Sequence, residues 1–512
     1  MATRRDFLTL SASALLAGRK ALPGGAGASV NQHGNKPSRL AADPQRPRYH
    51  LMPPANWMND PNGPIFWKGQ YHMFYQYNPH APVPEKMHWG HAVSFDLVHW
   101  KHLPIAIAPT PGGPDKDGCW SGCAVIDQGV PTLVYTGVFP QVQCIARSED
   151  GMMTWRKFRG NPVVDAPPQG MATTGFRDPC VWREGDQWFM AIGSGIEDQG
   201  GMVLLYRSRD LIDWDYLHLL CRGRRDQLTS GRDPVSTGEM WECPDFFPLG
   251  DQHVLIVSTE GAVFYSAGSY ANYYFHPQRQ GQVDLGDCYY AARSMADKDG
   301  RRILWGWIRE GRNEAAQRAA GWAGVMSLPR VLTLGPDSTL GIAPAREIES
   351  LRGKHQQFRN LAIVPGPVTA VKGVRGDSLE IQAELDPGVA AAVGLAIRIT
   401  PDGEEQTLIT YNRTTGHLVV DRGRSSLSHD VDRESQGGPF TLAEHEPLKL
   451  RVFLDASVIE IFANDRVCLT SRIYPSRPDS LAFDAFAQGG EARLKSLDVW
   501  EMRPISPNRL TT

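Results

Sequence analysis

The sequence predicts an all-β fold, a five-bladed β-propeller followed by a C-terminal β-sandwich. Apolar, aromatic-rich strands recur in the first two thirds of the 512-residue chain, at intervals of roughly 50 to 65 residues, which leaves room for one four-stranded sheet in each interval. These strands begin at Tyr71 (YHMFYQY), Thr132 (TLVYTG), Gln187 (QWFMAIGS), His253 (HVLIVST) and Arg302 (RILWGWI). Period-2 alternation between Gly, Pro and Asp turns then indicates a sandwich.

A second repeat interleaves with the first. Ser94–Trp100 (SFDLVHW) resembles Ser208–Trp214 (SRDLIDW), and Ser148–Asp150 followed by Trp155 is a variant of the same turn. The two repeats keep the same phase, and no long helical pattern separates the five units. This agreement favours a propeller over the alternative, a β-sandwich in which the similarity between segments is accidental.

Three carboxylates lie at one phase of this repeat, each about ten residues ahead of an apolar strand. Asp60, Asp178 and Glu242 stand in the segments WMNDPNG, FRDP and WECPD. In a blade the innermost strand runs along the central channel, and we expect the residues just before it to lie at one mouth of that channel. The segments Gly118–Gly122 and Asp284–Tyr290 share the phase in the other two blades. Converging carboxylates are what glycosidic bond cleavage requires, so the pattern predicts a glycoside hydrolase.

Each carboxylate also has a structural alternative. Asp60 stands in Asp-Pro-Asn-Gly, which is favourable turn chemistry, and Arg177–Asp178 would also make an ion pair within the fold. Glu242 would also serve as a charge on an edge strand. The tripeptide Arg232–Pro234 repeats Arg-Asp-Pro, but it precedes Glu242 in the same blade. Because its phase differs, we interpret it as a loop.

The composition excludes several classes of partner and cofactor. A net charge of −3, from 53 basic and 56 acidic residues, argues against nucleic acid or an anionic membrane surface as a partner. The 14 Trp and 15 Tyr residues fit sugar binding and β-rich cores equally well. Eight cysteines without C-x-x-C pairs or nearby His clusters argue against a zinc site. We expect no metal or cofactor, and free, buried thiols, with Cys119–Cys123 the one local pair left open.

The N-terminus, residues 1–28, is predicted to be a twin-arginine signal peptide. Arg4-Arg5 precedes the apolar run Phe7–Ala17 and an A-x-A cleavage site at Ala26–Ala28. About 11 apolar-rich residues are too few for a membrane anchor. Twin-arginine export carries folded proteins, so we expect a periplasmic or secreted enzyme that lacks membrane helices and whose thiols need not be paired.

The expected domains are a propeller over residues 45–340, a linker over 341–360 and a sandwich over 361–505. Pro344–Arg352 is polar and is predicted to include a short helix. The expected sandwich strands are Ser378–Leu385, Val393–Thr400, Leu448–Leu454 and Val458–Phe462. No catalytic group of residues is found in this last domain.

The chain closely resembles glycoside hydrolase family 32, which includes invertases, levanases, inulinases and fructan exohydrolases. The likeness extends from Tyr49 to Met502 and is carried by seven motifs in order: Trp57–Gly63, Phe74–Pro79, Trp89–Ala92, Phe176–Pro179, Trp241–Pro244, Gly321–Arg330 (GWAGVMSLPR) and Asp455–Phe462 (DASVIEIF). It implies a five-bladed propeller with a sandwich, and retaining hydrolysis of β-fructofuranosidic bonds that releases terminal fructose from sucrose or from the fructans levan and inulin.

The resemblance also implies a role for each residue at the centre of these motifs. Asp60 matches the nucleophile, which attacks the anomeric carbon to form a fructosyl-enzyme intermediate. Glu242 matches the general acid/base, which protonates the leaving group and then activates water. Asp178 matches the stabiliser of the transition state, and Arg177 would hold these carboxylates by charge-assisted pairing.

Five further residues match the walls of the family's pocket. Asn59 and Gln76 match ligands of sugar hydroxyls, Trp120 and Ser121 match a wall segment, and Trp307 would line the rim. Each of these residues would also suit the interior of a blade, so a structural role remains the alternative.

One departure from the family bears on substrate recognition. Many relatives have Val-Trp-Gly where this chain has Val83-Pro84-Glu85, so the wall must be built differently, and Trp89 is the expected substitute. A fructosyltransferase that uses a sugar in place of water is the alternative function, and a non-catalytic carbohydrate-binding protein is a second. Linkage preference, endo or exo action and oligomeric state do not follow from these patterns.

Overall fold

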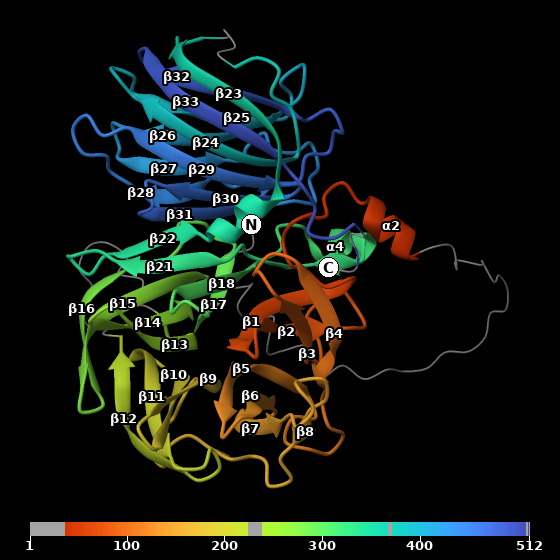
Figure 1. Cartoon of the computed structure of the whole chain (residues 1–512), viewed down its shortest axis with the longest axis vertical. Coiled ribbons are helices and arrows are strands. Elements are labelled where there is room, and N and C mark those ends of the chain that lie inside the picture. Colours follow the sequence, from red (N-terminus) through yellow and green to blue (C-terminus); the bar gives the residue numbers. More distant parts are fainter. Residues whose placement is uncertain (1–35, 224–237, 367–370, 508–509, 511–512) are drawn as a thin grey trace, which may run out of the picture. The chain divides into compact units, whose positions relative to one another are not determined.

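The computed structural model describes residues 36–223, 238–366, 371–507 and 510. The predicted signal peptide and the tripeptide Arg232–Pro234 therefore lie outside the described residues. From Arg39 onward the chain forms one compact unit. Five sheets surround a common centre as blades, and two larger sheets form a sandwich beside them (Figure 1). The predicted fold class is thus confirmed.

The blades follow one another along the chain. Blade 1 consists of β1 (Asn56–Trp67), β2 (Gln70–Asn78), β3 (His88–Ser94) and β4 (Trp100–Ile107). Blade 2 consists of β5 (Gly118–Asp127), β6 (Val130–Val138), β7 (Val142–Arg147) and β8 (Arg156–Lys157). Blade 3 consists of β9 (Gly175–Glu184), β10 (Gln187–Ile196), β11 (Gly200–Ser208) and β12 (Trp214–Arg222). Blade 4 consists of β13 (Glu242–Leu249), β14 (Gln252–Thr259), β15 (Ala262–Ala271) and β16 (Tyr274–Gln282). Blade 5 consists of β17 (Tyr289–Ala296), β18 (Arg302–Ile308), β21 (Arg330–Leu334) and β22 (Leu340–Pro344).

The innermost strands form a ring. Contacts join β1 to β5, β5 to β9, β9 to β13, β13 to β17, and β17 back to β1. After β18 the chain passes through helix α4 (Glu314–Ala320), β19 (Trp322–Ala323) and β20 (Val325–Met326). There β19 pairs in parallel with β1 and β20 pairs with β18, so a connection from blade 5 fastens it to blade 1.

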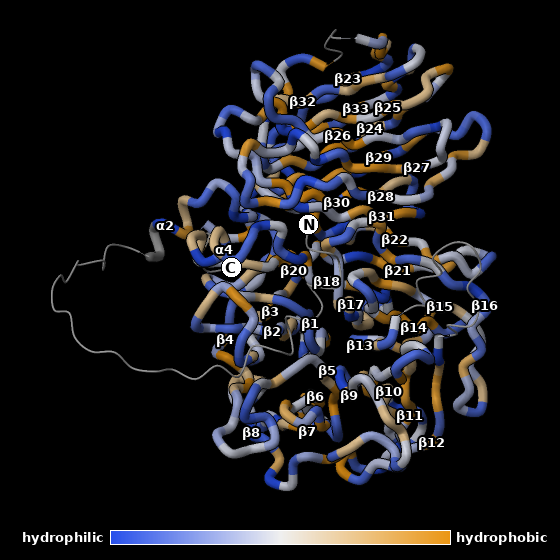
Figure 2. Tube along the Cα trace, turned by 180° about the vertical axis from the view of Figure 1, so that it is seen from behind, coloured by the Kyte–Doolittle hydropathy of each residue, from blue (hydrophilic) through white to orange (hydrophobic). Residues whose placement is uncertain are grey.

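The recurring apolar strands are the second strands of the blades, β2, β6, β10, β14 and β18, and not the innermost ones as predicted. The carboxylates lie on the innermost strands themselves or at their first residue. The physical reason is burial. A second strand packs against neighbouring blades on both faces and is almost continuously apolar, whereas an innermost strand turns side chains toward the channel. In Figure 2 the strands hold most of the hydrophobic stretches.

The second repeat is the turn between the third and fourth strands. Asp96 and Asp210 each accept two backbone N–H bonds within their turns, at 2.8–3.1 Å and 2.9 Å. Leu97 and Leu211 both have φ of 67°, in the left-handed region, and both side chains are buried. The interleaved repeat is therefore confirmed as one recurrent turn.

The sandwich begins sooner than predicted. The 3₁₀-helix η2 (Arg346–Leu351) follows β22 directly and leads into β23 (Arg352–Ile363), so the predicted linker 341–360 shrinks to the helix. The polar sequence after the helix is largely exposed because β23 is an edge strand. One sheet contains β23, β24 (Ser378–Asp386), β29 (Leu448–Asp455), β30 (Val458–Ala463), β31 (Val467–Arg472) and β33 (Ala492–Met502). The other contains β25 (Ala392–Ile399), β26 (Thr407–Asn412), β27 (His417–Asp421), β28 (Gln436–Pro439) and β32 (Ala482–Gln488).

The short α2 spans Lys36–Ala42. Among the described residues no helix is both long and apolar enough to cross a membrane. All eight cysteines are free thiols, including Cys119 and Cys123, and all but Cys123 are buried, as predicted.

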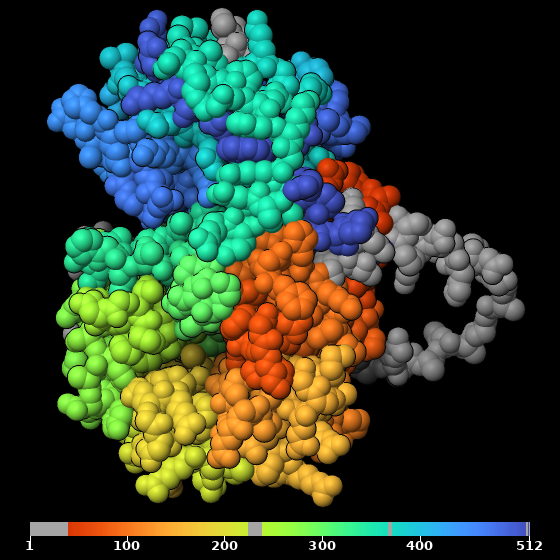
Figure 3. Space-filling model, in the orientation of Figure 1, coloured from red at the N-terminus to blue at the C-terminus, as the bar shows by residue number. Residues whose placement is uncertain are grey.

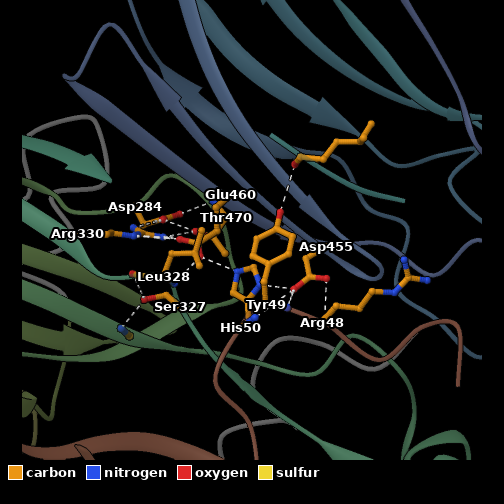
Figure 4. A network of polar contacts seen from close by, with 12 residues as sticks. Arg48, Tyr49, His50, Asp284, Ser327, Leu328, Arg330, Asp455, Glu460 and Thr470 are labelled. Carbon is orange, nitrogen blue, oxygen red and sulfur yellow. Dashed lines mark hydrogen bonds and ion pairs between the residues drawn. The ribbon is translucent and has the colours of Figure 1, made fainter. Parts of the chain in front are cut away.

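A buried charged network joins the sandwich to the propeller (Figure 4). His50 Nδ1 lies 2.8 Å from Asp455 Oδ2, and its Nε2 lies 3.0 Å from Glu460 Oε1. Arg330 of blade 5 bonds Glu460 at 2.5 Å and Asp284 at 2.8 Å. Buried charges are tolerated only when they are paired and hydrogen-bonded, so this network fixes one docking geometry. Burial alone lowers the pKa of His50, but its bonds to the two carboxylates raise it to about 9.

We predict that His50→Gln destabilises the protein in a pH-dependent way. Because the folded-state pKa of His50 is raised to about 9 from 6.5, its contribution is fully present below pH 6.5 and is lost as the pH rises through 9. Removing one partner of a buried pair costs roughly 3–5 kcal/mol. Denaturation at pH 7 should show a lower free energy of unfolding for His50→Gln than for wild type, and this difference should be smaller at pH 10. The exposed His445→Gln is the control. A deficit of equal size at both pH values would contradict the charged state of His50.

Candidate active site

Each innermost strand has a β-bulge at the phase of the predicted site. The register against the second strand shifts between Met58 and Pro61 in β1, Trp120 and Gly122 in β5, Arg177 and Cys180 in β9, Glu242 and Asp245 in β13, and Tyr290 and Arg293 in β17. A bulge bends a strand and changes the direction of its side chains. Proline lacks the N–H that a regular ladder needs and is tolerated at such points. The Pro-marked segments of the sequence are therefore the bulges that aim the carboxylates.

In blades 3 and 4, one residue of each bulge adopts an uncommon backbone conformation. Asp178 has φ of 64° and Cys243 has φ of 49°, a region that costs energy for residues other than glycine. Both are held by hydrogen bonds: Asp178 N–H donates to Thr136 Oγ1 at 2.9 Å, and Cys243 N–H donates to Asp178 Oδ2 at 3.0 Å. The strain at blades 3 and 4 thus serves to bring Asp178 and the residue after Glu242 together.

Asp60 lies at the centre of a polar cluster from blades 1 and 2. Ser121 Oγ donates to its Oδ2 at 2.5 Å and Asn59 Nδ2 donates to its Oδ1 at 3.1 Å. Gln76 Nε2 in turn donates to Ser121 Oγ at 2.5 Å. Burial and the charge of Asp178 raise the pKa of Asp60 to about 6, although the Ser121 bond lowers it. A carboxylate with this pKa is ionised at neutral pH and ready to attack.

The Cys243 thiol connects two of the carboxylates. Its Sγ lies 3.6 Å from Asp60 Oδ2 and 3.6 Å from Asp178 Oδ2. Burial raises the pKa of Cys243 well above its ordinary value, so the thiol stays protonated and can donate weakly to either oxygen. Burial likewise raises the pKa of Asp178, with the nearby Arg177 charge acting in the opposite direction.

Glu242 is held from two sides. Arg177 Nη2 donates to its Oε1 at 2.8 Å and Tyr290 OH donates to its Oε2 at 2.5 Å. The Arg177 Nε also lies 3.9 Å from Asp178 Oδ2. The structure therefore brings Asp60, Asp178 and Glu242 into one network, with Arg177 between the last two.

Sequence reasoning missed two residues of this network. Tyr290 fell within the segment Asp284–Tyr290 but received no role. Arg293 was not identified at all, and its guanidinium donates to the carbonyl oxygens of Asp178, at 2.9 Å, and of Pro244. Both carbonyls belong to bulges, where regular ladder bonding is interrupted. A charged residue three positions after Tyr290, on a largely apolar inner strand, was the available signal.

Two of the predicted wall residues, Trp120 and Trp307, lie in one aromatic cluster. Trp120 and Trp307 pack with Trp57, Met87 and Ala323 in one cluster, and both are only partly buried. Figure 3 shows the surface hollowed between the blades. Trp57 Nε1 donates to Asn59 Oδ1 at 2.8 Å, and the Arg177 guanidinium lies 5.8 Å from the centroid of the Trp120 ring, so this cluster adjoins the site.

Trp89 does not belong to that wall. It is fully buried, packs against Phe74 and Tyr135, and donates its indole N–H to the carbonyl of Trp120 at 3.0 Å. The prediction that Trp89 replaces the missing pocket tryptophan was wrong. Its strand, β3, is the third of its blade and lies away from the channel, so the ring fills the space between blades 1 and 2.

A propeller that delivers three carboxylates, with an arginine between two of them, to one site has the groups of a glycoside hydrolase. The particular family follows from sequence: the chain belongs to glycosyl hydrolase family 32. Residues 50–344 match "Glycosyl hydrolases family 32 N-terminal domain" and residues 347–501 match "Glycosyl hydrolases family 32 C terminal".

Individual relatives agree with this assignment. The chain is 39% identical to a sucrose-6-phosphate hydrolase of Zymomonas mobilis, over 91% of this chain and 94% of the relative. It is 34% identical to a levanase of Bacillus subtilis, over 90% and 71% of the two chains. Among solved structures, fructan 1-exohydrolase IIa from Cichorium intybus superposes with a TM-score of 0.81 at 30% identity, covering 90% of this chain and 98% of that chain.

We predict that Asp60→Asn stabilises the protein. Because the folded state raises the pKa of Asp60 from 3.8 to about 6, the ionised carboxylate opposes folding fully above pH 6 and not at all below pH 3.8. Removing the charge should raise the free energy of unfolding by up to about 3 kcal/mol at pH 7.5, because the pKa rises from 3.8 to about 6 and each pKa unit corresponds to about 1.4 kcal/mol. In thermal denaturation, the melting temperature of Asp60→Asn should exceed that of wild type at pH 7.5, and the difference should be smaller at pH 4. An unchanged melting temperature at pH 7.5, matching the exposed Asp186→Asn control, would contradict the predicted repulsion.

Proposed function

We propose that the protein is a retaining β-fructofuranosidase that releases terminal fructose from sucrose or fructans. The observation that carries this proposal is the convergence of Asp60, Asp178 and Glu242 in one hydrogen-bonded network, with Ser121 and Asn59 on the first and Arg177 and Tyr290 on the last. A binding module has no need of three carboxylates whose mutual repulsion must be offset. The non-catalytic alternative is therefore disfavoured.

In the first step Asp60 attacks the anomeric carbon C2 of the fructosyl unit. The Asp60–C2 bond forms as the bond from C2 to the bridging oxygen breaks, and Glu242 gives its proton to that oxygen. Asn59 donates a hydrogen bond to Oδ1 of Asp60 and Ser121 donates one to Oδ2. These bonds fix the orientation of the attacking carboxylate before substrate binds. Asp178 accepts hydrogen bonds from the ring hydroxyls while positive charge develops on the sugar.

In the second step Glu242, now ionised, takes a proton from water, and the hydroxide attacks C2 and releases Asp60. Arg177 and Tyr290 hold both oxygens of Glu242, so the side chain keeps its position between the two steps. Arg177 also neutralises the negative charge that returns to Glu242 when the proton is donated. Replacing the water by a sugar hydroxyl would give the transferase outcome on the same residues.

We favour unphosphorylated substrates, although some relatives are named sucrose-6-phosphate hydrolases. Within the described part of the chain, Arg177 is the arginine whose guanidinium pairs with these carboxylates, at 2.8 Å from Glu242 and 3.9 Å from Asp178. Arg293 is committed to the carbonyls of Asp178 and Pro244. The local excess of negative charge disfavours a phosphate group near the leaving group.

We further propose export through the twin-arginine pathway to the periplasm or medium. The support is the leader motif, Arg4-Arg5 before an apolar run, together with eight free thiols, which suit a protein folded in a reducing compartment. Replacing both arginines by lysine should retain the enzyme inside the cell, whereas wild type should appear outside the cytoplasm with a shortened N-terminus. Equal export of both forms, measured by fractionation and immunoblot, would exclude this route.

We predict that Asp60→Asn and Glu242→Gln lose activity in different ways. Asp60→Asn should lower kcat by about 10³-fold or more on every fructoside, because no covalent intermediate can form. Glu242→Gln should lose about 10²- to 10⁴-fold on sucrose, where the leaving group needs a proton. It should form the intermediate much faster from an aryl β-fructofuranoside, whose leaving group departs without one.

The measurement is the initial rate on both substrates, with a stopped-flow burst for the aryl fructoside. The exposed Asp186→Asn serves as control and should keep wild-type rates. If Glu242→Gln showed the same loss on both substrates, or if Asp60→Asn kept most of its activity, the assignment of the two roles would be wrong.

A further inference from the structure

Phe139 is an exposed aromatic side chain with a fixed position beside the active site. Half of it (51%) is accessible, which is unusual for a phenylalanine in a protein whose aromatic residues are mostly buried. Its ring meets the Trp120 ring edge-on, with the centroids 5.6 Å apart. Trp120 belongs to the cluster that lines the site, so Phe139 extends that wall toward solvent.

A short series of contacts connects Phe139 to the general acid/base. The Arg177 guanidinium lies 5.8 Å from the centroid of the Trp120 ring. The same guanidinium bonds Glu242 at 2.8 Å. Ser121, next to Trp120 in the chain, bonds Asp60. Trp120 therefore lies beside the point where the leaving group separates from fructose, and Phe139 lies one ring further out.

The segment around Phe139 is anchored on both sides. Lys116 Nζ donates to the carbonyl of Phe139 at 3.0 Å, and Asp117 N–H donates to the carbonyl of Val138 at 3.0 Å. On the other side Gln141 Oε1 accepts from Phe176 N–H at 2.7 Å and from Arg177 at 3.5 Å. An aromatic side chain held in this way loses little conformational freedom when a ligand stacks on it.

The anchoring residues also adjoin the segment in which this chain departs from its family. Lys86, directly after Val83-Pro84-Glu85, donates to the Lys116 carbonyl at 3.3 Å and pairs with Asp117 at 3.8 Å. The two residues that hold Phe139 are thus the neighbours of the segment that lacks the usual tryptophan. Trp89, the expected substitute, is buried, whereas about half of the Phe139 side chain is exposed.

We propose that Phe139 is a specificity-determining residue, an aromatic platform for a sugar unit beyond the one that Glu242 protonates. This inference rests on the proposed function. A disaccharide ends at Trp120 and Arg177, whereas a trisaccharide or a fructan chain places its next ring against the exposed face of Phe139. Flat aromatic rings pack against the C–H faces of sugars and bury apolar area on both partners. The predicted ligand class is therefore fructosylated oligosaccharides of three or more units.

The kinetic test compares a trisaccharide, 1-kestose, with sucrose. Phe139→Ala should lower the ratio of kcat/KM for 1-kestose to kcat/KM for sucrose by about 5- to 10-fold, which corresponds to one aromatic contact. Phe139→Trp should restore the ratio. Phe95→Ala, which removes another exposed phenylalanine (76% accessible) on the outer turn of blade 1, should leave it unchanged. An unchanged ratio in Phe139→Ala, or a fall that Phe139→Trp does not restore, would overturn the proposal.

A binding measurement separates this proposal from the proposed function. In the Asp60→Asn background, titration calorimetry with 1-kestose should show about 5- to 10-fold weaker binding when Phe139→Ala is added. If wild type hydrolyses neither sugar, the proposed function fails, and this titration still decides whether Phe139 binds sugar. Equal affinity with and without the Phe139 ring would contradict the platform.

Discussion

The structure depends on one constraint: three carboxylates from three different blades must stay close together although their charges repel. Bulges in the innermost strands bring Asp60, Asp178 and Glu242 to a common centre. Burial and mutual repulsion then raise the pKa of Asp60 to about 6. The other polar groups of the site, the Ser121 hydroxyl, the Cys243 thiol and the Arg177 guanidinium, offset this repulsion. The site is thus held together by the groups around the carboxylates, at some expense in stability.

This arrangement demands a rigid frame. The blades close into a ring because β19 returns to β1 and because β17 contacts β1. The sandwich supports the same region, since Arg330 of blade 5 pairs with Glu460 of β30 and with Asp284, which precedes β17. His50, just ahead of β1, pairs with Glu460 and Asp455. None of the described sandwich residues contributes a carboxylate to the network of Asp60, Asp178 and Glu242, and the sandwich instead supports the blades at which the ring closes.

Much of the fold and the centre of the site could be predicted from the sequence, because a repeat of fixed phase places equivalent residues at equivalent positions. Asp60, Asp178, Glu242 and Arg177 are brought together where the motifs indicated. The assignment of the apolar strands to the channel was wrong, since strong hydrophobicity marks burial between blades. The prediction for Trp89 was wrong for a related reason, because the position of a residue in the chain does not show which side of the blade its side chain faces. Arg293 was missed because it bonds carbonyls that only the bulges leave available.

The central claim is that the converging carboxylates hydrolyse fructosides, and the most direct measurement is a product analysis of the purified mature protein with sucrose, inulin and levan in separate reactions. The account predicts free fructose as the product from at least one of them, with no product longer than its substrate at low sugar concentration. Oligosaccharides longer than the substrate would show that a sugar hydroxyl replaces water as the acceptor. The absence of any product from a folded, stable protein would contradict the account.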